Sequence, residues 1–197
     1  ICFMGPPERG GDWTDEGVEG VFRFLSRLWR LGREVAERTE PGDPPSAPGG
    51  DARELLAKAH WAIDKATRDI SQDFQLHTAI AAVMELVNDA YRLKDGLYGS
   101  ADGDAAVRFA TATAASLIYP FAPHLACEVY EWLTGERLWE VAWPQAEPAL
   151  LVRDTVTIIV QVNGKRRAQL EVPADASEDR ILSLARDQGR PNSVPRS

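Results

Sequence analysis

Two groups of basic residues have the spacing needed to contact a phosphate backbone. The first group recurs at steps of three and four along one predicted helix: Arg23, Arg27, Arg30 and Arg33. At about 100° per residue, the first three share one side of that helix, and Arg33 lies slightly round from them. Such a row could follow phosphates through bidentate contacts. It could equally be a solvated face, in which Glu19 and Glu34 pair with arginines four residues away.

The second basic group is a run of three residues, Lys165, Arg166 and Arg167. It directly follows Asn163-Gly164, the strongest short signal for a two-residue hairpin turn. Alternate residues of a strand face opposite ways, so at most two of the three side chains can share a face. Two interpretations stay open: a basic hairpin that touches RNA, or charges that protect an edge strand from pairing.

The sequence has no pattern typical of an active site. It contains no Gly-rich phosphate loop, nucleophile elbow or paired metal-binding histidines. His124 and Glu128 are four residues apart on a predicted helix, but two ligands are too few for a metal. Cys127 lies on the same helix, where packing is the expected role of an unactivated thiol. We therefore predict no catalytic residue and no metal site in this chain.

Helical periodicity dominates the first three quarters of the sequence. Apolar residues at steps of three and four predict a buried face on the first helix: Val18, Val21, Phe22, Leu25, Leu28, Trp29 and Val35. Further segments of this kind follow a breaker-rich loop at 39–50, and one of them places Met84 among its core residues. Pro120 and Pro123 separate a fourth helix from a fifth. Residues 15–135 thus predict an antiparallel bundle of about five helices, within a helical domain that spans 15–150.

The period changes to two after Pro148. Alternating β-branched residues on both sides of Asn163-Gly164 predict a β-hairpin, and a short helix is expected after Ser177. Two strands and one helix are few for an independent domain. Residues 154–185 therefore predict a small, incomplete α/β unit, and 186–197 form an irregular tail.

The six tryptophans divide into two groups. Trp29, Trp61 and Trp132 lie on predicted helices, where we expect them in the core. Trp13, Trp139 and Trp143 lie near loops, where they could stack on bases, although packing at the ends of the bundle is the better expectation.

Composition limits the class of protein. The chain has 197 residues, two cysteines without paired spacing and a formal net charge of −8. No apolar run approaches the ~20 residues that cross a bilayer, and the cysteine usage is typical of a reducing compartment, so we expect a cytoplasmic protein. The acidic balance argues against a dedicated nucleic-acid binder, although a basic strip on an acidic protein can still bind phosphates.

Several segments, in order, resemble leucyl-tRNA synthetases of the bacterial type. They include Phe3-Met4-Gly5-Pro6-Pro7-Glu8, Asp12 to Gly20, Thr78 to Leu86, the prolines at 120–124, Trp143-Pro144 and Val160 to Lys165. The proline segment alone is shared with the synthetases for valine, isoleucine and methionine. The opening segment, the long first helix and the hairpin together indicate the leucine family. The opening, which lacks an initiator methionine, is typical of the interior of a longer protein.

The resemblance implies a helical domain of the anticodon-binding type, followed by part of a C-terminal α/β domain. The expected partners are leucine tRNA, bound through the two basic groups, and a catalytic domain of the same parent chain. Residues 1–14 would be the arm from that catalytic domain, with a docking surface made by Phe3, Met4, Pro6 and Trp13. The parent family uses ATP and magnesium, but its His-Ile-Gly-His and Lys-Met-Ser-Lys-Ser signatures are absent here. We therefore expect no cofactor and no activity in this portion alone.

A second hypothesis is a helical module that docks protein rather than RNA. On either hypothesis we expect a monomer that contacts no membrane.

Overall fold

The computed structural model describes residues 15–46, 48–72, 74–151, 155–162 and 165–173. The chain divides into two compact units, Ile1–Leu151 and Val152–Ser197. The first unit is helical throughout its described part, and the second contains a pair of strands.

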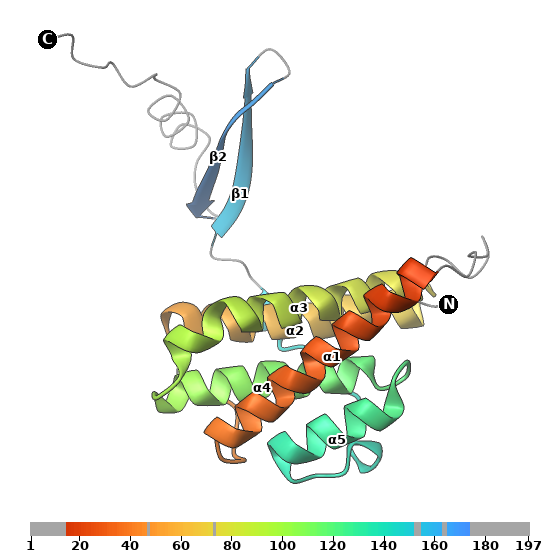
Figure 1. Ribbon diagram of the computed structural model, residues 1–197. Helices are drawn as coiled ribbons and strands as arrows, with labels where there is room; N and C mark the ends of the chain where they lie inside the picture. Colours follow the sequence, from red (N-terminus) through yellow and green to blue (C-terminus); the bar gives the residue numbers. More distant parts are fainter. Residues whose placement is uncertain (1–14, 47, 73, 152–154, 163–164, 174–197) are drawn as a thin grey trace, which may run out of the picture. The chain divides into compact units, whose positions relative to one another are not determined.

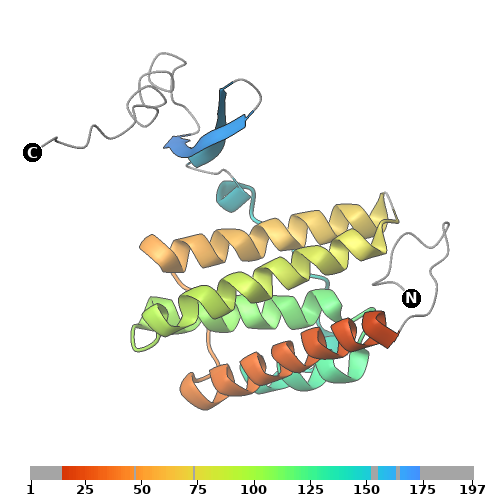
Figure 2. The same cartoon turned by 45° about the horizontal axis from the view of Figure 1, so that its top comes forward.

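Five long helices build the first unit, with a 3-10 turn and a short helix after them (Figure 1). Their bounds are α1 (Asp15–Arg38), α2 (Gly50–Ser71), α3 (Leu76–Leu97), α4 (Ala101–Ile118), α5 (Pro123–Thr134), η2 (Leu138–Glu140) and α6 (Pro148–Leu151). The helices α2, α3 and α4 lie side by side, and each reverses the direction of the one before (Figure 2). The prediction of a mainly helical fold is confirmed.

The helix ends follow from local sequence. Ser100 caps α4 by accepting a hydrogen bond from the Gly103 amide at 3.2 Å. Pro123 stands at the start of α5, where its missing amide hydrogen costs nothing. Gly135 ends α5 in the left-handed conformation, with φ of 74°. These signals mark the start of α4 and both ends of α5.

The centre of the bundle is α4, which contacts α1, α2, α3 and α5. Most of its residues are buried, and many are alanines: Ala105, Ala106, Ala110, Ala112, Ala114 and Ala115. Small side chains let the neighbouring helices approach closely, while Leu117 and Ile118 fill the remaining space at the end of the helix. Four helices therefore share one continuous core around α4.

The buried face of α1 agrees with the prediction at Leu28 and Val35 and differs from it elsewhere. Its core residues are Phe24, Leu28, Leu31 and Val35. Of the predicted face, Phe22 is 69% exposed, Val18 40% and Trp29 37%. The sequence carries two apolar stripes, and the contacts of α1 with α4 and α5 decide which one is buried. A Cβ on Gly32 would meet Val129 Cγ1 at 2.6 Å, so the bare backbone of this residue lets α5 approach.

Two further core predictions need correction. Trp29 lies at the edge of the bundle, where its ring meets Trp132 edge-on with centroids 4.6 Å apart. Met84 is 38% exposed, on the outer side of α3. Trp61 and Trp132 pack against the core while remaining partly exposed. Large apolar side chains on outer helices thus cover the core edge without being enclosed by it.

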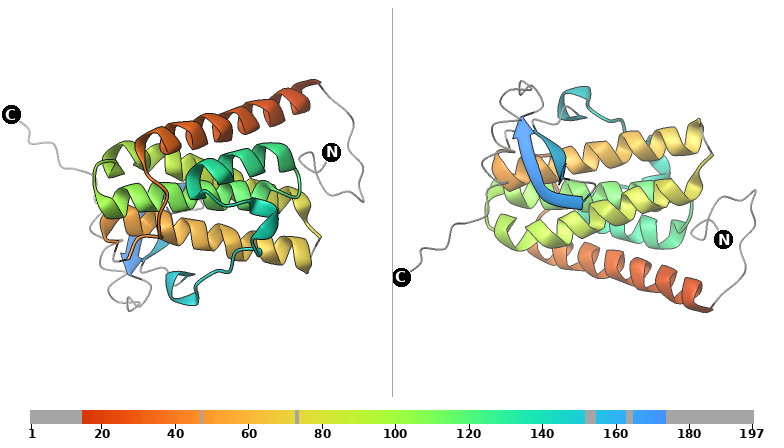
Figure 3. Two further views of the ribbon diagram at one scale, coloured as in Figure 1. Left: turned by 90° about the horizontal axis from the view of Figure 1, so that it is seen from below. Right: turned by 90° about the horizontal axis from the view of Figure 1, so that it is seen from above.

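Figure 3 shows α1 along one edge of the bundle, with α2 at the opposite edge. Among the described helices of this unit, α1 packs chiefly on α5 and α4, with slighter contact to α3. Its other side is covered by none of the described long helices of this unit.

The second unit contains β1 (Thr155–Val162) and β2 (Lys165–Pro173), which pair antiparallel. Their register runs from Thr155 opposite Pro173 to Val162 opposite Lys165, and it shifts between Val160 and Gln161. The shift leaves Arg167 opposite no residue of β1. The predicted turn at 163–164, the helix after Ser177 and the tail at 186–197 lie outside the described residues.

Candidate nucleic-acid interface

The arginine row of α1 lies in a segment that is flanked by acidic residues. From Gly20 to Arg33 the helix contains four arginines and no aspartate or glutamate. The acidic neighbours are Glu19 before this segment and Glu34 after it. A segment with one sign of charge on an outer helix gives a local positive potential, even in a chain of net charge −8.

Arg23 and Arg33 are held loosely. Arg23 Nη1 lies 3.4 Å from Glu19 Oε1, and Arg33 Nε lies 3.0 Å from Glu37 Oε1. All four side chains are largely exposed. Exposed pairs of this kind contribute about 0–1 kcal/mol. A phosphate could therefore replace either carboxylate at little cost.

Arg30 is exposed and has no ion-pair or hydrogen-bond partner among the described residues. The sequence allowed Glu34 to neutralise it, but Glu34 is engaged elsewhere: its carboxylate accepts from Lys94 Nζ at 2.6 Å and lies 3.8 Å from Arg38. The predicted pairing with a glutamate four residues away is therefore wrong for Arg30. It is correct for Arg23, which does pair with Glu19.

Lys94 explains the position of the Glu34 carboxylate. This lysine is almost fully buried and bridges Glu34 and Asp95. Burial disfavours its charged form, but the hydrogen bonds to Glu34 and Asp95 outweigh burial and raise the pKa of Lys94 above its usual value. A charged lysine at the α1–α3 contact therefore holds Glu34 away from the arginine row.

Arg27 has a different environment from the other three arginines. Its Nη1 donates to Asn88 Oδ1 at 2.9 Å, and its guanidinium lies 4.9 Å from the centre of the Tyr91 ring. The Tyr91 hydroxyl in turn donates to the Arg27 carbonyl at 2.9 Å. These contacts fix α1 against α3. Arg27 therefore helps to orient the arginine row, whether or not it also contacts a phosphate.

The other predicted site residues are described only in part. Lys165, Arg166 and Arg167 begin β2, at the end of the strand pair that pairs Val162 with Lys165, and only their backbone is described. The expected docking residues Phe3, Met4, Pro6 and Trp13 lie outside the described residues.

The loop residues Trp143 and Trp139 have different environments in the structure. Trp143 packs on α2 and donates from Nε1 to Thr67 Oγ1 at 2.8 Å, so its role is structural. Trp139 is 54% exposed in η2, with the Arg137 guanidinium 5.8 Å from its ring centre. An exposed indole beside an arginine is suited to stacking on a base. The sequence had grouped both residues together because both lie near loops.

No described group of three or more His, Cys, Asp or Glu side chains could hold a metal ion. Cys127 is half-buried, and burial together with Glu131 raises the pKa of its thiol, which keeps it protonated and unreactive. None of the described helices is long and apolar enough to cross a membrane.

A comparison with protein-family models gives a match to this chain. The family model described as the anticodon-binding domain of tRNA ligase matches residues 52–182. The chain therefore belongs to the family of anticodon-binding domains of tRNA ligases.

The relatives described below are both ligases for the same amino acid, leucine. A leucine–tRNA ligase of Nitratidesulfovibrio vulgaris (strain DP4) is 43% identical over 189 residues, which cover 93% of this chain and 23% of the relative. That of Geobacter sp. (strain M21) is 40% identical over 196 residues, 96% of this chain and 23% of the relative. The chain thus spans less than a quarter of the length of these relatives.

A solved structure has the same fold. It is the ternary complex of Agrobacterium radiobacter K84 agnB2 LeuRS with tRNA and LeuAMS, with a TM-score of 0.69 and 25% identity. The match covers 88% of this chain and 22% of that one.

Proposed function

We propose that this chain is the tRNA-binding part of a leucyl-tRNA synthetase, which holds leucine tRNA while a catalytic domain of the parent protein performs leucylation. The supporting observation is the exposed, acid-free arginine row of α1, on a domain whose relatives are leucine–tRNA ligases. Arg23, Arg30 and Arg33 would contact phosphates, and Arg27 would hold α1 in position.

Contacts of this kind position the RNA without reading its sequence, because every phosphate presents the same oxygens. Contacts to phosphates also release counterions from the RNA, and this release is less favourable when the salt concentration is high. The affinity for RNA should therefore fall as salt increases. The basic residues at the start of β2 would add to this grip as part of a small α/β unit with a hairpin turn. Phe3, Met4, Pro6 and Trp13 would dock the catalytic domain, where the parent enzyme would bind ATP and magnesium. On this proposal the protein acts as a cytoplasmic monomer.

The test is the affinity of the full chain for leucine tRNA, measured by fluorescence anisotropy at several salt concentrations. Arg30→Ala should weaken binding roughly tenfold. This equals ~1.4 kcal/mol, the size expected for one charge-assisted contact. It should also lower the slope of log affinity against log salt by about 1. Leucine tRNA and a non-cognate tRNA should lose affinity to the same degree.

Arg92→Ala is the matched control. Arg92 is also an exposed arginine, but Glu54 and Asp89 both hydrogen-bond it, and these bonds raise its pKa. Its removal should leave tRNA affinity unchanged. Equal losses for Arg30→Ala and Arg92→Ala would mean that α1 is not the contact surface.

A protein-docking module is the second candidate, favoured by the apolar flank of α1. Phe22, Val18 and Trp29 are exposed on one side of the helix. This flank would face the parent's catalytic domain. Phe22→Ser should then weaken binding of a separately produced catalytic domain while leaving tRNA affinity unchanged. Loss of tRNA affinity in this variant would instead assign the flank to RNA.

A further inference from the structure

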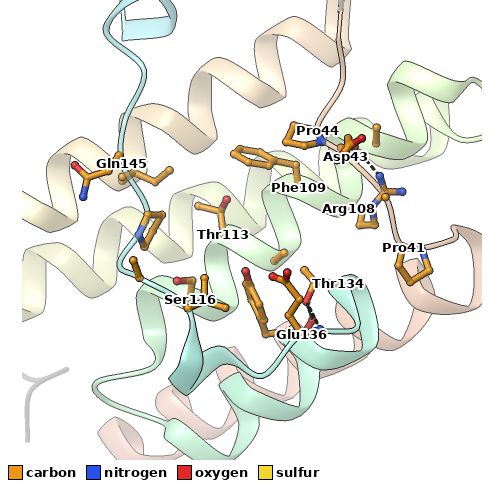
Figure 4. Close-up of a pocket in the computed structure, with 18 of the residues that line it drawn as sticks. Pro41, Asp43, Pro44, Arg108, Phe109, Thr113, Ser116, Thr134, Glu136 and Gln145 are labelled. Atoms are coloured by element: carbon orange, nitrogen blue, oxygen red, sulfur yellow. Dashed lines mark hydrogen bonds between the residues drawn. The ribbon is translucent and has the colours of Figure 1, made fainter.

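A cavity of about 680 Å³ opens in the helical unit, on a part of the bundle that the proposed tRNA contacts do not use (Figure 4). It lies between α2, α4 and α5, and the loop after α1 and the segment after α5 complete its wall. Pockets for small molecules typically enclose about 300–1,000 Å³. The volume therefore suits one compact organic ligand.

Two residues of α4 with hydroxyl groups, Thr113 and Ser116, line this cavity. Thr113 is 5% exposed and Ser116 is 7% exposed. Neither side chain makes a hydrogen bond within the described part of the chain, whereas Thr111 on the same helix bonds back to the Val107 carbonyl at 2.8 Å. Figure 4 shows both residues on the cavity wall, where a bound molecule could satisfy them.

A carboxylate and a phenol face the same space. Glu136 lines the cavity, and its carboxylate has no ion pair among the described residues. The Thr134 hydroxyl accepts from the Glu136 amide at 3.1 Å and so fixes the backbone that carries this carboxylate. Burial, together with Glu136, raises the pKa of Tyr130, so its hydroxyl stays protonated and can donate. One wall of the cavity thus offers three hydroxyls and one strong acceptor.

The remaining wall is apolar and aromatic. The rings of Phe109 and His60 stack with centroids 5.3 Å apart and planes inclined by 23°. Pro44 and Pro144 also line the cavity, and Phe109 lies between Pro44 and Thr113 in Figure 4. Flat aromatic and proline surfaces are suited to packing against a planar heterocycle.

The wall is held by hydrogen bonds between distant segments. Arg108 donates to the carbonyls of Glu40 and Asp43, at 2.6 and 2.9 Å, and so fixes the loop after α1. The Glu147 amide donates to His60 Nδ1 at 3.0 Å and fixes the segment after α5. Both sides of the opening are therefore preorganised, which lowers the entropic cost of binding.

We propose that this cavity binds a nucleoside moiety. The base would pack beside Phe109 and the prolines, while the ribose hydroxyls would donate to Glu136 and exchange hydrogen bonds with Thr113 and Ser116. A carboxylate that accepts from ribose hydroxyls is a recurring device in nucleotide sites. The carboxylates of Glu136 and Asp43 repel phosphate, and two donors of Arg108 are already engaged. The phosphate of a nucleotide must therefore remain outside.

The test is an amide chemical-shift titration of the full chain with adenosine, guanosine, cytidine and uridine. At least one nucleoside should give saturable shifts confined to residues that line the cavity. Thr113→Val and Glu136→Gln should each weaken that binding by about tenfold, the effect of losing one hydrogen bond to the ligand. Absence of saturable shifts, or an affinity in both variants unchanged from that of the parent chain, would overturn the proposal.

Control variants separate the cavity from general effects. Glu131→Gln removes a carboxylate from α5, and Ser71→Ala removes a hydroxyl from the end of α2; neither residue lines the cavity. Both variants should bind the nucleoside like the parent chain. Ribose alone should bind much more weakly, and equal affinity for ribose would contradict the role of the aromatic wall.

Two sources of a nucleoside moiety are distinguished by a phosphate. If the natural ligand is a free nucleoside, the 5′-monophosphate should bind more weakly than the nucleoside. If it is an unstacked residue of an RNA, the 5′ position should point to the solvent and the two affinities should agree. Because tRNA affinity is measured separately with Arg30→Ala, failure of the cavity proposal leaves the proposed function standing.

Discussion

The edge helix α1 and the central helix α4 use the same residue type for opposite purposes. Arg30 of α1 is exposed and has no partner within the described residues, whereas Arg108 of α4 is 8% exposed and donates to two backbone carbonyls. α1 packs on one side only, and α4 contacts four other helices. The number of packed sides decides whether an arginine can meet a ligand or must serve the fold.

The same contrast explains the two candidate sites. The exposed row on α1 offers charge to a large anionic partner at the surface. The hydroxyls on α4 can meet only a molecule small enough to enter the cavity beside them. Replacing the buried Arg108 of α4 should therefore lower the stability of the fold, whereas replacing the exposed Arg30 of α1 should change binding and leave stability nearly unchanged.

The largest expected effect is on Arg108. Arg108→Met keeps the aliphatic stem and removes the donors to the carbonyls of Glu40 and Asp43. Unfolding free energy should fall by about 1.5–3 kcal/mol, the range for a hydrogen bond with a charged partner. Arg30→Met is the matched change, and it should alter stability by less than about 0.5 kcal/mol. Urea denaturation measures both, and equal losses would remove the distinction between the two arginines.

Two glycines of α1 sharpen the comparison within one helix. A Cβ on Gly32 would meet Val129 Cγ1 at 2.6 Å, so Gly32→Ala should destabilise the fold by about 1–3 kcal/mol. A Cβ on Gly20 meets nothing within 4 Å, so Gly20→Ala should stabilise by up to about 1 kcal/mol through helix propensity. Thermal unfolding should therefore shift in opposite directions. A shift of the same sign in both would contradict the close α1–α5 approach.

The smallest expected effect concerns pH and His60. Burial lowers the pKa of this histidine from 6.5, the Glu147 carboxylate opposes the shift, and Nδ1 accepts the Glu147 amide. The unfolded chain therefore binds a proton more readily, and the stability from neutral His60 is present above pH ~6.5 and lost as pH falls below it. His60→Asn removes the titrating group. Its urea midpoint should depend less on pH between about 5 and 7, and an unchanged dependence would show that other groups dominate.

Most of the helical framework could be predicted from local sequence. Ser100 marks the start of α4 through its side-chain hydroxyl, and Pro123 and Gly135 mark the two ends of α5 through their backbones, so these helix ends follow without tertiary information. The buried face of α1 could not be predicted in the same way. Phe24 and Phe22 lie on different apolar stripes, and only packing against α4 and α5 decides that Phe24 is buried.

The candidate sites divide along the same line. The arginine row was visible because helical spacing alone places it on one side of α1. The cavity had no sequence signal, since Thr113 and Ser116 stand among the alanines of α4 and resemble ordinary core positions. The engagement of Glu34 by Lys94 was also invisible, because the two residues are sixty positions apart.

The sequence by itself determined the helices, their ends and the helical spacing of the arginines, because these depend on neighbours within four residues. Only the tertiary structure decided which arginine stays available, which apolar stripe is buried and where a cavity remains. Those outcomes depend on contacts between segments far apart in the chain, and local periodicity carries no information about such contacts.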